Sequence, residues 1–309
     1  MGFGPQFADL DGDGKKDLVS GSWPGEVYCF KGQGGGTFAA PIKLGFEDGT
    51  ELNVGKAASV AVGDWDGDGD LDLLIGVISG EVWFVPRVAK EWNKGFGPGQ
   101  KIQVGSKDLR VPGGDAGPAL ADFDRDGITD LLVGAGNGSV LLYRRVRKGD
   151  ALLLQPPQIL LPRGDSQPKD PKRHGQRSKL QVLDWNGDGR MDLLVGDFST
   201  EPGAAPKLSQ AQQEKKKSLL ARRSRISAGL GERIRALSRK VRKALGYGER
   251  ETIPPTRRKA FNRALLKAYA GDPAYNKLRA ESLKIAEKLA PLSPKQILHG
   301  RVRLFLQRG

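Results

Sequence analysis

Nine residues in the first third of the chain have the composition and spacing of a cation-binding loop. The segment DWDGDGDLD, residues 64–72, places an aspartate at every odd position. Carboxylates this close repel one another unless a hard cation lies among them, and Ca²⁺ prefers six to eight oxygen ligands in a flexible shell. Because alternate side chains of an extended turn point the same way, the odd positions can converge on one ion. Gly69, at position six, permits the sharp bend that such a loop requires.

The loop geometry assigns a ligand to each odd position. We expect Asp64, Asp66 and Asp68 each to give one carboxylate oxygen, and Asp70 to give its backbone carbonyl. Asp72 is expected to give both of its carboxylate oxygens. The sequence therefore predicts a calcium site in this segment.

The same pattern occurs three more times. The copies are DLDGDGKKD at residues 9–17, DFDRDGITD at 122–130 and DWNGDGRMD at 184–192. Their first ligands are separated by 55 residues (64 − 9), 58 (122 − 64) and 62 (184 − 122). A nearly constant period of this length indicates a repeat architecture.

The flanking residues distinguish these loops from EF-hands. An EF-hand closes with a glutamate at position twelve and continues into a helix, whereas position twelve here is Ser20, Ile75, Val133 or Val195. Each loop is followed by an apolar run such as DLLIG, a glycine turn and an alternating segment such as EVWFV. The pattern predicts a strand, the ligand loop, a strand, a turn and a further strand.

These motifs resemble the FG-GAP or VCBS repeats, which are also found in integrin α chains. The resemblance covers residues 1–200 and the last ten residues, with its FG and GAP signature reduced to FGP at 3–5 and AGP at 116–118. It implies a mainly β fold, a β-propeller of about four blades, with Ca²⁺ held between the first two strands of each blade. The ligand positions that it implies in the other copies are Asp9, Asp11, Asp13, Lys15 and Asp17; Asp122, Asp124, Asp126, Ile128 and Asp130; and Asp184, Asn186, Asp188, Arg190 and Asp192. We therefore expect about four calcium sites.

Position two of each loop is always large and apolar. The four residues are Leu10, Trp65, Phe123 and Trp185. Alternation directs them away from the ligands, and their recurrence predicts packing between neighbouring blades rather than a platform for sugars.

The composition of the chain limits the other classes of function. Its 309 residues are 38% hydrophobic and include 43 glycines, which suits a core linked by many tight turns. Cys29 is the only cysteine, so an intrachain disulfide is excluded, and its place in a strand predicts a small buried hydrophobe. The sequence contains no stretch of 18 apolar residues, so no transmembrane segment is predicted. Outside the loops no acid, base and nucleophile suggest an active site, so we expect a protein that is not an enzyme.

A basic segment interrupts the last repeat. Residues 201–300 contain 24 Lys and Arg against 8 acids, a net charge of +16, and residues 301–309 add +3. Since the whole chain carries +14, residues 1–200 carry 14 − 19 = −5. Apolar residues at spacings of three and four predict helices here, with a break in the first of them at Gly229 and Gly231.

The final residues GRVRLFLQR resemble the third strand of each repeat, for example GEVYCFK. We therefore predict propeller repeats at 1–200, a basic α-helical insertion inside the last blade at 201–299, and a returning strand at 300–309.

Three functions are consistent with this organisation. We favour a non-catalytic calcium-binding scaffold for interaction or adhesion, with a protein or carbohydrate partner at the cell surface. The alternatives are binding of nucleic acid or another anionic polymer by residues 201–299, which could equally form a solvated amphipathic hairpin, and an enzyme of unidentified chemistry. Loops without a closing glutamate are expected to bind calcium at extracellular strength, about 0.1 to 1 mM. This predicts an extracellular or envelope location, with an export signal upstream of Met1.

Overall fold

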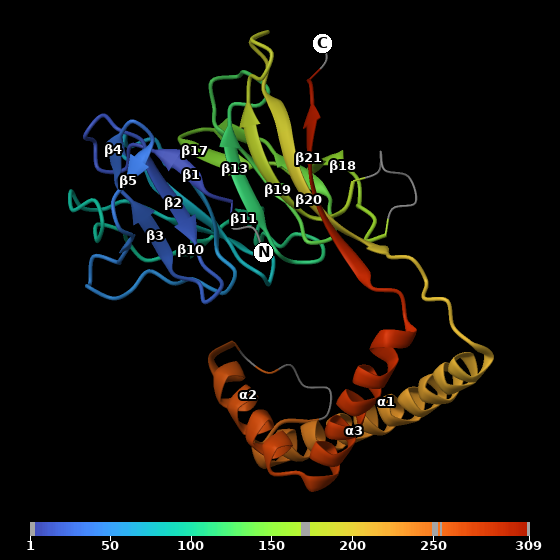
Figure 1. Cartoon of the computed structure of the whole chain (residues 1–309). Helices are drawn as coiled ribbons and strands as arrows, with labels where there is room; N and C mark the ends of the chain where they lie inside the picture. Colours follow the sequence, from blue (N-terminus) through green and yellow to red (C-terminus); the bar gives the residue numbers. More distant parts are fainter. Residues whose placement is uncertain (1–3, 168–173, 249–252, 254, 308–309) are drawn as a thin grey trace. The chain divides into compact units, whose positions relative to one another are not determined.

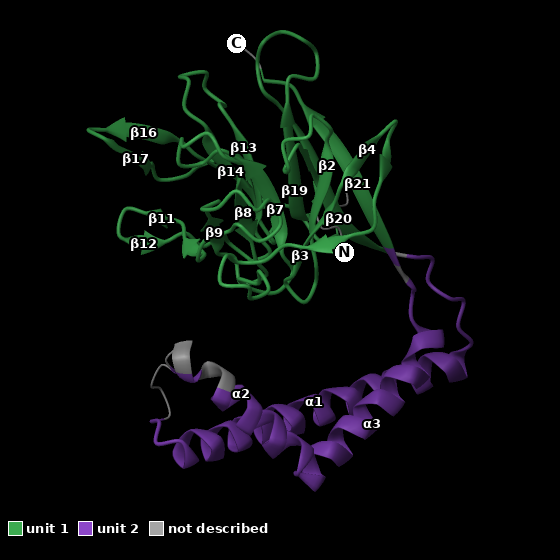
Figure 2. Cartoon of the chain, turned by 90° about the vertical axis from the view of Figure 1, so that its left-hand side faces the viewer, with its two compact units in different colours: residues 1–201, 298–309 green, residues 202–297 purple. Residues whose placement is uncertain are grey.

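The computed structural model describes residues 4–167, 174–248, 253 and 255–307. The chain forms two compact units, one of Met1–Glu201 with Leu298–Gly309 and one of Pro202–Ile297 (Figure 2). The predicted boundaries, after residues 200 and 299, fall beside these. Phe3 of the FGP motif, and Arg308 and Gly309 of the returning strand, lie outside the described residues.

The first unit contains four antiparallel sheets that follow one another along the chain (Figure 1). Sheet 1 comprises β1 (Gln6–Ala8), β2 (Asp17–Gly21), β3 (Val27–Phe30) and β6 (Ile42–Lys43). Sheet 2 comprises β7 (Ser59–Gly63), β8 (Asp72–Gly76), β9 (Val82–Val85) and β10 (Gln100–Lys101). Sheet 3 comprises β13 (Gly117–Ala121), β14 (Asp130–Gly134), β15 (Val140–Tyr143) and β18 (Gln158–Leu161). Sheet 4 comprises β19 (Gln176–Leu183), β20 (Asp192–Pro202) and β21 (Gln296–Phe305).

Three two-stranded ribbons extend from these sheets. They are formed by β4 (Gly32–Gly34) with β5 (Thr37–Phe38), β11 (Gln103–Val104) with β12 (Lys107–Asp108), and β16 (Arg145–Lys148) with β17 (Ala151–Leu154). The prediction of a mainly β repeat fold with helices is confirmed. Closure of the sheets into a four-bladed ring stays a prediction.

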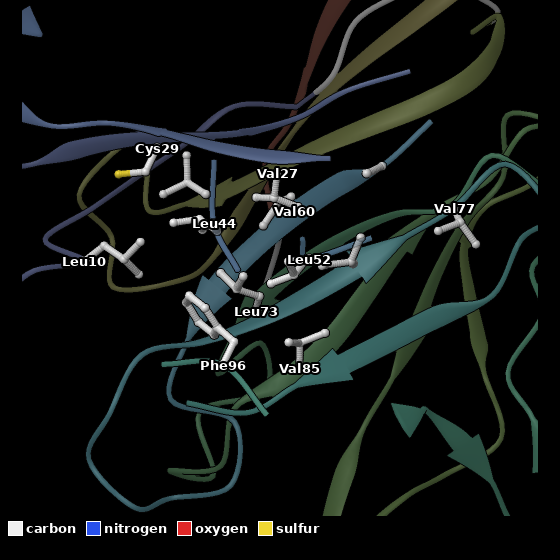
Figure 3. Packing of buried hydrophobic residues seen from close by; sticks show 13 residues of the cluster. Leu10, Val27, Cys29, Leu44, Leu52, Val60, Leu73, Val77, Val85 and Phe96 are labelled. Atoms are coloured by element: carbon white, nitrogen blue, oxygen red, sulfur yellow. The ribbon is translucent and has the colours of Figure 1, made fainter. Parts of the chain in front are cut away.

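Consecutive sheets pack face to face through apolar side chains. Between sheets 1 and 2, Val27 and Cys29 meet Val60 and Leu73, and all four side chains are buried (Figure 3). Equivalent clusters lie between sheets 2 and 3 and between sheets 3 and 4. Burial raises the pKa of the Cys29 thiol to about 12, in agreement with its predicted role as a small core residue.

A glycine at the end of the second strand in sheets 1 to 3 permits this close approach. A Cβ atom at Gly76 would lie 2.4 Å from the carbonyl oxygen of Ala116 in the next sheet. A Cβ atom at Gly21 would lie 2.1 Å from the carbonyl oxygen of Ala58. The repeated DLLxG pattern therefore encodes sheet-to-sheet packing as well as strand propensity.

The four residues at position two of the loops are not all buried. Leu10, Trp65 and Phe123 are buried in the three clusters between sheets, as predicted. Trp185 is 57% exposed, so the prediction is wrong for this residue. The physical reason is that no described sheet follows sheet 4 to cover it.

The second unit is helical. It contains α1 (Gln210–Ala244), α2 (Pro255–Ala270), α3 (Pro273–Leu289) and the short 3₁₀ helix η1 (Ala290–Leu292). Ile226 of α1 packs with Ile285 and Leu289 of α3, so the unit has a small core of its own. Asp272 caps α3 and pairs with Arg233, and the hydrogen bond from this guanidinium lowers the pKa of the Asp272 carboxyl to about 2.

The predicted break in the first helix is wrong, because α1 continues through Gly229 and Gly231. A Cβ atom at Gly229 would lie 3.6 Å from Leu278 of α3. This distance is an ordinary van der Waals contact, so a side chain as small as that of alanine would fit here. The packing of α1 on α3 offsets the low helix propensity of the two glycines. None of the described helices is long and apolar enough to cross a membrane.

Candidate metal centres

All four acidic loops join the first strand of a sheet to its second strand in the same register. The pairs Ala8 with Asp17, Gly63 with Asp72, Ala121 with Asp130 and Leu183 with Asp192 close the four loops. The loops therefore lie at the same end of their sheets.

The first aspartate organises each loop by accepting backbone amides. The two carboxylate oxygens of Asp64 accept hydrogen bonds from Gly67 N at 2.7 Å and Gly69 N at 3.1 Å. In the other loops Asp9, Asp122 and Asp184 likewise accept the amide at position six together with one at position four or five. Gly69 has a φ of 94°, which confirms the need for glycine at position six.

Three of the loops gather acidic oxygens closely enough for one cation. Ligand atoms lie within 4.8 Å of one another in each of three trios, which are Asp9, Asp11 and Asp13; Asp64, Asp66 and Asp72; and Asp122, Asp124 and Asp126. Clustered carboxylate oxygens are the donor set that a hard divalent ion such as Ca²⁺ prefers. The donor chemistry of these residues therefore fits calcium.

The remaining predicted ligands are placed differently. Asp68 lies outside the trio of its loop, and its carboxylate accepts the backbone amide of Asp70 at 2.9 Å. In the fourth loop, Asn186 donates to Asp188 at 3.1 Å, and the described acids there form no such trio. At position seven, the amides of Lys15, Ile128 and Arg190 bond to the aspartate at position five. The carbonyl ligands at position seven stay predictions.

Charged neighbours differ between the loops. Lys31 pairs with Asp11, and Arg144 lies 3.0 Å from Asp124. The equivalent position in sheet 2, fourteen residues after the ninth aspartate, is Pro86. In that loop burial and the charge of Asp68 raise the pKa of Asp66. The second loop thus lacks the ion pair that the first and third loops form at this position.

The aspartate at position nine is the most buried acid of each loop. Asp72 is 0% exposed, and its two oxygens accept amide bonds from Trp65 at 2.8 Å and from Arg87 at 2.8 Å. The carboxylate thereby links the loop to the end of the third strand. The two amide bonds give Asp72 a structural role. Its bidentate binding of calcium stays a prediction.

The same link recurs in the other loops, but in the fourth loop the partner of the aspartate lies much farther along the chain. Asp17 binds the amide of Gly32 and Asp130 that of Arg145, in both cases fifteen residues later. Asp192 instead binds the amide of Gln307, which is 115 residues later. The chain therefore leaves sheet 4 after β20, forms the helical unit, and returns in β21 in the same register as the other third strands.

Two buried arginines were missed by the sequence analysis. Arg87, two residues after β9, donates to the carbonyl of Leu10 in the first loop at 3.2 Å. Arg145, the first residue of β16, donates to the carbonyl of Trp65 in the second loop at 2.7 Å and lies 3.8 Å from the centre of its ring. Burial lowers the pKa of both guanidinium groups. Their shared position, fifteen residues after the ninth aspartate, is the signal that could have revealed them.

The fold and the loops define a repeat protein of small antiparallel sheets, each with an acidic loop between its first two strands. The model of the FG-GAP-like repeat family matches residues 9–75 and 122–195. The chain is therefore an FG-GAP repeat-containing protein.

Two solved structures are also similar to part of the chain. One is an Agrocybe aegerita lectin that recognises non-reducing terminal N-acetylglucosamine, at 18% identity and a TM-score of 0.32, covering 68% of this chain and 54% of that chain. The other is BBS1N in complex with ARL6DN, soaked with lead, at 12% identity and a TM-score of 0.30, covering 64% and 51%. The chain spans about half the length of these two structures.

Proposed function

We propose that this protein is a non-catalytic, calcium-binding FG-GAP scaffold that serves interaction or adhesion at the cell surface or in the cell envelope. Its partner would be a protein or a carbohydrate. One observation carries the proposal: three acidic trios recur at the same end of successive sheets. Calcium at these positions would neutralise the carboxylates and hold each loop against its sheet.

Two further features support this proposal. The buried thiol of Cys29, with its pKa raised to about 12, is a poor nucleophile, so this cysteine does not suggest thiol catalysis. The loops lack a closing glutamate, which favours calcium affinity of extracellular strength, about 0.1 to 1 mM. Such sites would stay empty at cytosolic calcium concentrations, so the proposed location follows from the proposed chemistry.

Calcium binding can be tested by isothermal titration calorimetry on the full chain. We expect uptake at three or four sites, with the second loop tightest and the fourth weakest, because five acids lie in the second loop and Asn186 replaces an acid in the fourth. The double variant Asp64→Asn, Asp66→Asn should lose the tightest site. The matched control is Asp150→Asn, which removes an exposed acid outside the loops and should bind like the wild type. Absence of any calcium uptake at 10 mM, roughly ten times the weakest affinity expected here, would refute the proposal.

Binding of an anionic polymer by the helical unit is a second candidate. A cavity of about 520 Å³ on this unit is lined by Arg233, Arg239, Lys240, Arg242 and Lys243. Clustered cations of this kind release counterions when they contact phosphates or sulfates. The same helices also pack on one another through Ile226 and Ile285, which suits the simpler role of a solvated hairpin.

A charge-reversal experiment distinguishes these two roles. In the polymer-binding case, Arg239→Glu with Lys243→Glu should elute from heparin at clearly lower salt than the control pair Lys277→Glu with Arg279→Glu. All four side chains are exposed, so both variants should fold. Equal elution of the two variants would show that the cavity on α1 does not bind the polymer.

A further inference from the structure

One face of sheet 4 is apolar and uncovered. We define the open face as Trp185, Leu194, Val302 and Leu304. Val302 is 74% exposed, Trp185 57% and Leu304 40%. Side chains of this kind normally avoid so much contact with water when they lie together on a sheet.

The same register positions are buried in the other sheets. The bond between Gln307 and Asp192 aligns β21 with the earlier third strands, so that Val302 corresponds to Val27, Val82 and Val140. These three valines are each 0% exposed. Leu194 corresponds to Val19, Leu74 and Leu132, which are also 0% exposed. In each earlier case the next sheet along the chain provides the cover.

The first unit does not cover the open face with its own sheets. A cavity of about 720 Å³ is lined by Phe198 and Val302 of sheet 4 and by Trp23, Ala58 and Ser59 from sheets 1 and 2 and their connections. The inner strands β1 and β19 do approach each other. Gln6 donates to Gln181 at 3.4 Å. The exposure of Val302 shows that this approach leaves the outer strands of sheet 4 open.

Sheet 1 presents the complementary half of the same type of interface. Phe7 is 62% exposed, and Leu18, Tyr28 and Phe30 are only partly buried on the same face. Their counterparts in sheet 2 are Val62, Leu73, Trp83 and Val85, which pack against sheet 1. One copy of the chain therefore exposes both halves of an interface that it already uses three times internally.

We propose that the open face of sheet 4 binds sheet 1 of a second copy of this chain. The contact continues the order in which sheets 1 to 4 already pack, with Val302 and Leu304 against Phe7 and Leu18. The contact joins two different surfaces and is therefore a heterologous interface. It forms a closed dimer when each copy covers both exposed faces of the other, and a larger assembly when it does not. Burial of these apolar side chains supplies the driving force.

The oligomeric state of the full chain tests this inference. By light scattering coupled to size exclusion, in 10 mM calcium, the wild type should associate as its concentration rises from about 1 to 100 μM, the range expected for modest interfaces. Val302→Asp and Phe7→Asp should each weaken association roughly tenfold or more, because a charge is placed in an apolar contact. The control Ile159→Asp changes an exposed apolar residue of β18 and should associate like the wild type. Unchanged melting temperatures would show that the variants fold.

A mixing experiment tests the heterologous geometry itself. A Val302→Asp copy keeps an intact sheet 1, and a Phe7→Asp copy keeps an intact open face. Equimolar mixing should therefore restore one interface and give a mixed dimer, although neither variant associates strongly alone. A wild type that stays monomeric at 100 μM, the upper limit of the proposed range, would overturn the inference and point to another cover for the face. Failure of the mixture to associate would exclude pairing of sheet 4 with sheet 1.

Discussion

Chelation of calcium is expected to lower the melting temperature of the sheet unit by more than any substitution of an exposed residue does. A ligand that binds only the folded state stabilises it by RT ln(1 + [L]/Kd). With Kd values of about 0.1 to 1 mM, 10 mM calcium contributes about 1.4 to 2.7 kcal/mol per site. Occupation of three trios would thus contribute about 4 to 8 kcal/mol. Without the ion, carboxylates within 4.8 Å of one another repel.

The measurement is a thermal melt followed by circular dichroism in the β region, in 10 mM calcium and then in excess EGTA. The double variant Asp64→Asn, Asp66→Asn should show a smaller loss on chelation, because one site is already removed. Magnesium at the same concentration is the control for ionic strength, since Mg²⁺ retains its waters and requires a stricter geometry. An identical melting temperature in calcium and in EGTA would contradict the proposed metal role.

Asp72→Ala is expected to destabilise the sheet unit strongly even in EGTA. The carboxylate is fully buried and accepts the amides of Trp65 and Arg87. Its removal leaves two buried donors without an acceptor, at a cost of about 1 to 3 kcal/mol each. The free energy of unfolding should therefore fall by roughly 2 to 6 kcal/mol.

The control for this substitution lies two residues away in the same loop. Asp70→Ala removes an exposed acid whose side chain is not needed to close the loop, and it should change stability little. Asp72→Asn keeps one acceptor oxygen and should fall between the two. If Asp72→Ala unfolds at the same urea concentration as Asp70→Ala in EGTA, the structural role given to Asp72 is wrong.

The loops and the strands around them could be predicted because they are encoded locally. Spacing of two places the aspartates, glycine at position six provides the bend, and the DLLIG type of run forms the strand. The return of β21 was also predictable, because its alternating pattern repeats that of the earlier third strands. The shared position of Arg87 and Arg145 is visible in the sequence, but a local pattern does not show that each contacts the preceding loop, 77 and 80 residues away.

The sequence by itself determined which segments form the repeats, where the acidic loops lie and where the helices interrupt the last sheet. Only the tertiary structure decided what the side chains contact. The bond from Arg145 to Trp65 spans 80 residues, and the one from Gln307 to Asp192 spans 115. Such contacts form when one sheet packs on the next. No described sheet packs on the far face of sheet 4, so Trp185 is exposed, whereas Leu10, Trp65 and Phe123 are buried. A local pattern fixes the direction of a side chain, but only the neighbouring sheet decides whether water or protein meets it.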